Sequence, residues 1–263
     1  MEVKRIVVKV GTSTLTHPSG RLNLERLDKL ARVLSDIKNG GRDVLLVTSA
    51  AIGAGASALN FEQKPETVSG KQAAAAVGQC RLMHIYDKLF AEYGHTVAQI
   101  LVTRGDLGEP RRALSLSNTL EQLFEWNVVP VINENDSVSH EEILSEQNIF
   151  GDNDTLSALA AALVKADLLV LLTDRDGFYT ADPNTDPDAQ KLDRVTRITD
   201  AMRCGAGGAG SARGTGGAIT KLAAAGIALE KGFPMVVAHG KDPAVLYAVL
   251  RGENVGTLFA RQQ

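Results

Sequence analysis

Apolar residues along this chain form two alternating kinds of pattern. Short unbroken runs of aliphatic and β-branched residues are typical of buried strands, and longer stretches with apolar residues three and four positions apart are typical of helices. The expected strands span residues 6–10, 44–47, 97–102, 128–132, 168–172, 235–238 and 255–259. The expected helices span residues 24–37, 71–93, 114–126, 156–164, 219–231 and 243–250.

This alternation of strands and helices predicts an α/β fold. Several expected strands show no polar alternation, so both of their faces must be buried. Such strands are typical of a mainly parallel sheet that carries helices on both sides. Ligands of these sheets bind beyond the carboxyl ends of the strands, so the residues that follow each strand are the first candidates for a functional site.

Small, hydroxylic or carboxylic residues follow four of the expected strands. One such turn is ordinary, because Gly, Asn, Asp and Ser favour turns in any protein. Four of them at one edge of a sheet favour a binding site. The four segments are Gly11-Thr12-Ser13, residues 48–55, Asn133-Glu134-Asn135-Asp136 and Thr173-Asp174.

Two lysines lie where a phosphate could bind. Lys9 interrupts an otherwise apolar strand just before Gly11, and a buried lysine is costly unless it meets an anion; the alternative is a lysine at a strand end that reaches water. Lys221 follows the glycine-rich run 205–217 and lies in the first turns of an expected helix. Backbone N–H groups at a helix start bind anions, although glycine-rich runs are also common as flexible linkers.

Three polar residues precede the helix expected at 156–164. One Asp or Asn suffices to cap a helix, whereas this chain has Asp152, Asn153 and Asp154 in a row. We expect Asp152 to be the cap, which leaves Asn153 and Asp154 available for chemistry.

Bulk properties and missing motifs exclude several classes of protein. The net charge of -3 gives no electrostatic case for nucleic acid or an anionic membrane as a partner. No apolar run approaches the roughly 20 residues of a membrane helix, and Cys80 and Cys204 form no CxxC motif, so we expect a cytoplasmic protein. Rossmann and Walker A motifs are not satisfied, and the histidines lack metal-ligand spacing.

The remaining candidates suit phosphoryl transfer. That reaction depends on neutralising negative charge and aligning the reactants rather than on covalent help from the protein. No histidine is placed as a general base, and a carboxylate acceptor needs none because it is already ionised at neutral pH. An acid is therefore the favoured substrate.

Six segments of the chain resemble the amino acid kinase superfamily. Within it they are most similar to the branch that phosphorylates glutamate, and the resemblance covers nearly the whole chain. The segments are VVKVGTS from Val7, TSAAI around Ser49, PVINENDSV from Pro130, GDNDTLSALAA from Gly151, LLTDRDGFYTADP from Leu171 and GTGGAITK from Gly214.

This resemblance implies a three-layer αβα sandwich and a reaction. The γ-phosphate of ATP would pass to the side-chain carboxylate of L-glutamate, with Mg²⁺ bridging the phosphates, as the first step of proline biosynthesis. The chain would form one kinase domain, residues 1–263, which binds glutamate mainly through residues 1–165 and ATP mainly through residues 166–263. No C-terminal PUA domain is expected. L-proline is the expected feedback inhibitor, and a dimer or tetramer is the expected assembly.

Motif matches assign the expected roles. Ser49, Asp136 and Asn153 would bind glutamate. Lys9 and Lys221 would stabilise the transferring phosphoryl group, and Asp154 would lie between these lysines and orient them. Direct Mg²⁺ ligands are not assigned, because the metal would be held mainly by phosphates and water. The expected ATP-binding residues are Lys9, Gly11, Thr173, Asp174, Thr215, Gly216, Gly217, Ala218, Ile219, Thr220 and Lys221.

The chain departs from the family pattern at two positions, and two other functions stay open. Ala50 replaces a glycine, which would affect substrate affinity, and Ala218 replaces a methionine near the nucleotide. A kinase that acts on N-acetylglutamate is one alternative, disfavoured because Asp136 suits a free amino group. A non-catalytic amino acid sensor is the other, disfavoured because both lysines and Asp154 are present.

Overall fold

A single sheet of eight strands forms the centre of the molecule. The computed structural model describes residues 2–17, 19–138, 153–206 and 216–262. The strand order is β3-β4-β2-β1-β5-β9-β10-β8, and every pair is parallel except β9 with β10. The mainly parallel sheet is thus confirmed. The strands are β1 (Arg5–Val10), β2 (Asp43–Val47), β3 (Val97–Val102), β4 (Val129–Glu134), β5 (Leu168–Thr173), β8 (Arg194–Val195), β9 (Met235–His239) and β10 (Thr257–Phe259).

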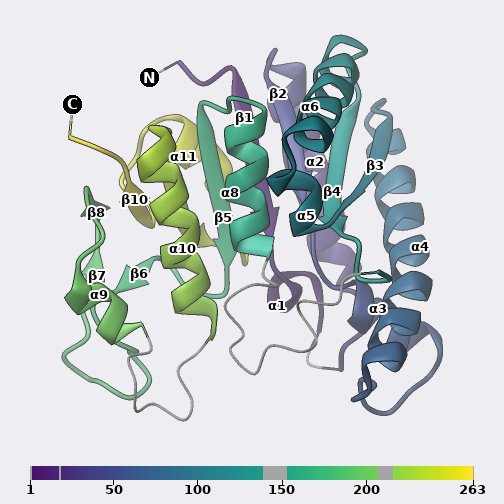
Figure 1. The fold of residues 1–263 in the computed structure, drawn as a ribbon, viewed down its shortest axis with the longest axis horizontal. Helices are drawn as coiled ribbons and strands as arrows, with labels where there is room; N and C mark the ends of the chain where they lie inside the picture. Colours follow the sequence, from purple (N-terminus) through teal and green to yellow (C-terminus); the bar gives the residue numbers. More distant parts are fainter. Residues whose placement is uncertain (1, 18, 139–152, 207–215, 263) are drawn as a thin grey trace.

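Helices cover both faces of this sheet, as Figure 1 shows. One face packs against α2 (Leu24–Asn39), α4 (Val68–Glu92) and α11 (Val245–Leu250). The other packs against α6 (Pro110–Glu125), α8 (Asn153–Leu163) and α10 (Gly216–Lys231). The three-layer αβα sandwich is confirmed. The shorter elements are α1 (Thr12–Leu15), α3 (Ala51–Ala58), α5 (Arg104–Gly108), α9 (Asp200–Gly205) and an antiparallel pair, β6 (Phe178–Tyr179) with β7 (Lys191–Leu192).

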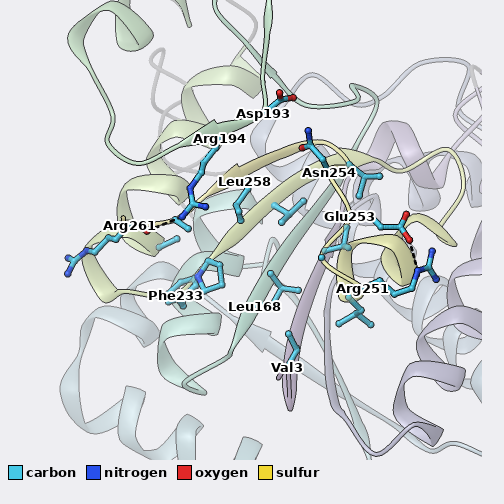
Figure 2. A pocket seen from close by; sticks show the side chains of 18 of the residues that line it. Val3, Leu168, Asp193, Arg194, Phe233, Arg251, Glu253, Asn254, Leu258 and Arg261 are labelled. Carbon is cyan, nitrogen blue, oxygen red and sulfur yellow. Dashed lines mark hydrogen bonds and ion pairs between the residues drawn. The ribbon is translucent and has the colours of Figure 1, made fainter. Parts of the chain in front are cut away.

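The residues at the carboxyl ends of the strands differ in chemical character from those at the amino ends. The carboxyl ends of β1, β2, β4 and β5 lead into the polar segments noted in the sequence. At the amino ends of the strands, a cavity of about 720 Å³ lies among the residues that precede or begin β1, β5 and β9, including Val3, Leu168 and Phe233 (Figure 2). None of the residues predicted to bind substrate or nucleotide lines this larger cavity, so cavity volume alone does not locate the functional site.

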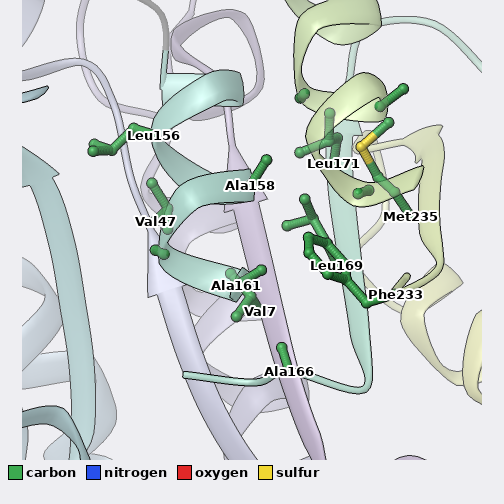
Figure 3. Packing of buried hydrophobic residues seen from close by; sticks show 14 of the residues in the cluster. Val7, Val47, Leu156, Ala158, Ala161, Ala166, Leu169, Leu171, Phe233 and Met235 are labelled. Atoms are coloured by element: carbon green, nitrogen blue, oxygen red, sulfur yellow. The ribbon is translucent and has the colours of Figure 1, made fainter. Parts of the chain in front are cut away.

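Alternation along β1 divides the core into two halves. Ile6, Val8 and Val10 belong to the apolar cluster under α2, α4 and α11, whereas Val7 belongs to the cluster under α8 and α10 (Figure 3). Because successive side chains of a strand point to opposite faces, Lys9 emerges on the same side as Val7. Its side chain is thereby directed toward the first turn of α8.

Helices α3 and α4 cross with their backbones in contact. A Cβ atom added at Gly78 of α4 would overlap the carbonyl oxygen of Ala51 in α3, and one added at Gly55 of α3 would overlap the carbonyl oxygen of Ala74 in α4. Only glycine permits this approach. The crossing fixes the start of α3, and with it Ser49 and Ala50, against the long helix α4.

No helix in the part of the chain that the structure describes combines the length and the apolar character needed to span a lipid bilayer. Cys80 and Cys204 are exposed free thiols.

Candidate active site

Asp154 joins both predicted lysines. It lies in the first turn of α8 and is completely buried. One carboxylate oxygen, Oδ1, lies 2.6 Å from Nζ of Lys9, and the other, Oδ2, lies 3.2 Å from Nζ of Lys221. Lys9 is the penultimate residue of β1 and lies on the α8 side of the sheet, and Lys221 lies in the second turn of α10. The arrangement is the one that the resemblance implied, with the carboxylate between two ammonium groups.

The two lysines keep Asp154 ionised. Burial alone would raise the pKa of its carboxyl, but the positive charges of Lys9 and Lys221 outweigh burial and hold the pKa below its usual value. A buried carboxylate of this kind is stable only because both of its oxygens meet cations. It can therefore act as a fixed negative anchor for the two ammonium groups at neutral pH.

Thr220 adds a third contact to Asp154. Its hydroxyl lies 3.1 Å from Oδ2 of Asp154 and 3.1 Å from the carbonyl oxygen of Gly217. The side chain is buried, and its hydroxyl is directed into the protein. Nζ of Lys221 also donates to the carbonyl oxygen of Gly217, at 3.0 Å. Lys221 is thus held from two directions, by Asp154 of α8 and by the first turn of its own helix, α10.

Glycines flank both ammonium groups. A Cβ at position 11 would lie 3.5 Å from Nζ of Lys9, and a Cβ at position 217 would lie 3.4 Å from Nζ of Lys221. Side chains at positions 11 and 217 would thus occupy the space beside these nitrogens, beginning with a Cβ atom in ordinary van der Waals contact. Their absence leaves room for an anion such as a phosphoryl group beside each lysine.

Asn153 belongs to a second network next to the first. Its Nδ2 donates to the carbonyl oxygen of Thr48 at 2.5 Å, to Oγ of Ser49 at 2.8 Å and to Oδ1 of Asn133 at 3.0 Å. Asn133 in turn donates from Nδ2 to Oε1 of Gln79, at 2.7 Å. The segments after β2 and β4 thereby converge on the start of α8.

Ser49 belongs to this network, and the predicted residue Asp136 follows Asn133 closely along the chain. Asp136 is half-buried in the turn that follows β4. Ser49 immediately precedes Ala50, which has a left-handed backbone with φ of 80°. An alanine in that conformation is strained by roughly 1–2 kcal/mol. Ala50, which stands in place of the expected glycine, adopts this turn at that cost, and its side chain is buried in the apolar cluster that α4 covers.

A cavity of about 310 Å³ opens beside Lys221. Its lining includes the predicted residues Asp174, Gly217 and Ala218, together with the aromatic rings of Phe178 and Tyr179. Thr173, at the end of β5, does not line it; its hydroxyl accepts from the backbone N–H of Arg175 at 3.0 Å and thus shapes the turn that carries Asp174. The cavity has the size of a small-ligand site.

Two predictions fall outside the described residues. Thr215 and Asp152 both lie there, so the proposed nucleotide contact of the first and the proposed capping role of the second stay predictions. Gly216 and Ile219 belong to the first turn of α10.

Three residues of the two networks received no role, or another role, from the sequence. Asn133 stands in a polar run that also serves as a turn, Gln79 lies inside an alanine-rich helix, and Thr220 was grouped with the nucleotide contacts. Only the contacts at Asn153 and Asp154 connect them to the site. The one usable signal was the burial expected for Asn133 at the end of an apolar strand, because a buried amide needs partners.

The described residues contain no group of three or more His, Cys, Asp or Glu side chains that could hold a metal ion.

Comparisons with known proteins identify the family and the fold of this chain. The profile of the amino acid kinase family matches residues 4–239. A glutamate 5-kinase of Clostridium perfringens is 52% identical over 260 residues, which cover 99% of this chain and 96% of that protein. A glutamate 5-kinase of Symbiobacterium thermophilum is 52% identical, over 98% of this chain and 97% of that protein. Among solved structures, UMP kinase of Bacillus anthracis has a TM-score of 0.63 at 17% identity, over 100% of this chain and 98% of that one, and shares the fold.

Proposed function

The chain belongs to the amino acid kinase family, in the group of glutamate 5-kinases, and we propose that it transfers the γ-phosphoryl group of ATP to the side-chain carboxylate of L-glutamate. The product, L-glutamyl 5-phosphate, is the first intermediate of proline biosynthesis. The observation that carries this proposal is the pair of lysines joined by Asp154: Nζ of Lys9 at 2.6 Å and Nζ of Lys221 at 3.2 Å from opposite oxygens of one buried carboxylate.

Two adjacent residues connect the two halves of the reaction. Asp154 anchors the lysines that would contact the transferring phosphoryl group. Asn153 anchors the segment of Ser49 that would bind glutamate. The acceptor carboxylate is ionised at neutral pH and attacks without a general base. The protein therefore contributes alignment of the two substrates and positive charge at the transferring group.

The lysines supply that charge from two sides. Lys9 belongs to β1 and Lys221 to α10, so a phosphoryl group beside both lysines would be bound by two separate elements. Gly11 and Gly217 leave space for it beside each ammonium group. Since Asp154 already holds both lysines in place, little reorganisation accompanies the build-up of negative charge.

The nucleotide would occupy the cavity beside Lys221. Phe178 and Tyr179 offer apolar surface to a base, while Asp174 and the start of α10 lie toward the phosphates. Mg²⁺, when bound, neutralises phosphate charge. We propose that phosphates and water hold it. Glutamate would then be bound mainly by residues 1–165 and ATP mainly by residues 166–263.

Asp136 would select the free amino acid. An ammonium group gains from a carboxylate partner, whereas an N-acetyl group does not. We further propose that L-proline inhibits by competing near the glutamate site, that the protein is cytoplasmic, and that it forms a homo-oligomer.

A coupled assay tests this function. Purified protein with ATP and Mg²⁺ should release ADP with L-glutamate and much less with N-acetyl-L-glutamate. Lys9→Met and Lys221→Met should each lower kcat by roughly 10²-fold or more, the scale for one preorganised donor. Lys29→Met, which removes only an exposed pair with Glu25, is the matched control. Equal turnover of both acids, or unchanged kinetics in both variants, would contradict the proposal, and a sensor would release no ADP at all.

A further inference from the structure

A chain of side-chain amides connects α4 to the first turn of α8. It begins at Gln79, which is buried in α4 next to the glycine crossing, and passes through Asn133 to Asn153. Nδ2 of Asn133 lies 2.7 Å from Oε1 of Gln79, and Oδ1 of Asn133 lies 3.0 Å from Nδ2 of Asn153, so both contacts are hydrogen bonds.

The direction of every bond in this chain is determined at one end. A backbone carbonyl can only accept, so the atom of Asn153 that lies 2.5 Å from the carbonyl oxygen of Thr48 must be its nitrogen. That nitrogen then requires an acceptor from Asn133, which turns the Asn133 oxygen toward α8 and the Asn133 nitrogen toward α4. Gln79 must consequently present its own oxygen, Oε1.

These hydrogen-bond directions leave one buried donor without a partner in the described part of the chain. Nε2 of Gln79 is enclosed and has no hydrogen-bond partner among the residues that the structure describes. Leaving a buried donor unpaired costs free energy, so a residue that does so calls for a functional explanation. The nitrogen is too enclosed to contact a substrate, which points to its partner atom, Oε1, as the useful one.

We propose that Gln79 is a positioning residue: it holds the amides of Asn133 and Asn153 in one orientation, so that Asn153 turns its carbonyl oxygen away from the protein network and toward the ammonium group of the acid substrate. The two hydrogens of the Asn153 amide nitrogen are shared among three protein acceptors, and the amide oxygen lies on the other arm of the same planar group. Asn153 is therefore an acceptor for the substrate rather than a donor. The proposal rests on the proposed function, because the ammonium group is that of glutamate.

Gln79→Met tests this role, because methionine fills a similar volume but offers no comparable acceptor. Without the hydrogen bond from Asn133 to residue 79, the amides of Asn133 and Asn153 are free to turn. The KM for L-glutamate should rise roughly tenfold, the scale of one hydrogen bond, while kcat and the KM for ATP change by less than about twofold. Glutarate, which lacks the amino group, is used as a competitive inhibitor; its inhibition constant should change far less than the KM for glutamate.

Two further variants separate positioning from stability. Gln79→Glu keeps an acceptor oxygen for Asn133 and should restore most of the preference for glutamate over glutarate. Leu82→Ala removes a buried apolar side chain one turn along α4; it should lower the melting temperature and leave that preference unchanged. Gln79→Leu, which also lacks the acceptor, replaces Gln79→Met if the methionine variant does not fold.

The outcomes are distinct. An unchanged preference in Gln79→Met, an equal loss in Gln79→Glu, or an equal loss in Leu82→Ala would each overturn the role of Gln79 while the wild type still phosphorylates glutamate. A wild type that releases no ADP with glutamate would instead overturn the proposed function itself.

Discussion

Asn153 and Asp154 are neighbours in the first turn of α8, yet their side chains belong to different hydrogen-bond networks. Asn153 contacts the segments after β2 and β4, whereas Asp154 contacts β1 and α10. Consecutive residues of a helix are rotated by about 100° from each other, so one helix start can serve two sites at once. This explains why polar residues accumulate here beyond the needs of a cap.

Asp154→Asn should lower both activity and stability. The variant keeps the shape of the side chain but leaves the ammonium groups of Lys9 and Lys221 without a negative partner. Breaking a buried ion pair in this way costs about 3–5 kcal/mol, and kcat should fall by roughly 10²-fold or more. Steady-state kinetics and chemical denaturation measure the two effects. Asp43→Asn, which weakens the pair with Arg5 at the opposite edge of the sheet, is the control and should lower stability only.

The pH dependence of this loss follows from the pKa of Asp154. Because the pKa in the folded protein lies below its value in the unfolded chain, the ion pairs contribute fully above pH of about 4, the usual value for an Asp, and their contribution is lost as the pH falls through the folded-state pKa. The difference in stability between wild type and Asp154→Asn should be constant from pH 8 to about 5 and shrink below that. A constant difference down to pH 2 would contradict this assignment.

Thr220→Val should lower kcat and leave the KM for ATP unchanged. Valine matches threonine in shape but removes the hydroxyl that contacts Asp154 at 3.1 Å. Loss of one hydrogen bond to a charged group corresponds to about 1.5–3 kcal/mol. Thr220→Ser retains the hydroxyl and should behave as wild type. If Thr220 instead binds the nucleotide, as its motif suggests, the KM for ATP should rise in the valine variant.

Gly78→Ala should destabilise the protein strongly. The added methyl group would meet the backbone of α3 rather than a movable side chain, and overpacking of this kind costs about 1–3 kcal/mol or more. Because α3 begins just after Ser49, the KM for glutamate should rise as well. Gly70→Ala is a useful comparison, since it meets mainly the side chains of Thr67 and Pro65 near the free end of α4. A variant with wild-type melting temperature would show that α3 can move aside.

His95 should make the protein less stable at mildly acidic pH. Burial lowers its pKa, and the nearby positive charge of Lys38 acts in the same direction, although a hydrogen bond to the backbone of Ser35 partly opposes them. The folded state therefore binds this proton less readily than the unfolded chain, so stability is present above pH of about 6.5 and declines below it. Thermal melts from pH 8 to 5 should show a smaller decline in His95→Asn, whereas the exposed His84→Asn should match the wild type.

The sequence was sufficient for the main fold because its long elements carry strong patterns. The expected strand at residues 6–10 and the expected helix at residues 24–37 differ from β1 and α2 by two residues at most. Short elements were not predicted, because α3 and the β6–β7 pair contain too few residues for any periodicity to be visible. The antiparallel pairing of β10 was also unforeseen, because an apolar run carries no information about the direction of its neighbour.

Motifs located Lys9, Asp154 and Lys221, but they could not reveal Gln79. It lies 54 positions from Asn133 and among alanines whose pattern predicts only a helix. Its role depends on which atom of an amide faces which neighbour. That information arises only when α4, β4 and α8 are brought together, so the residues that support a site are harder to predict than those that form it.

The glycine crossing of α3 and α4 also limits how this sequence can diverge. When two side chains clash, a smaller neighbour can restore the fit, and the two positions drift as a pair. At Gly55 and Gly78 the obstacles are backbone atoms of Ala74 and Ala51, which every amino acid possesses. No second substitution can create the missing space, so each glycine is constrained on its own account, and a mutational library that varies either position would be depleted of stable members.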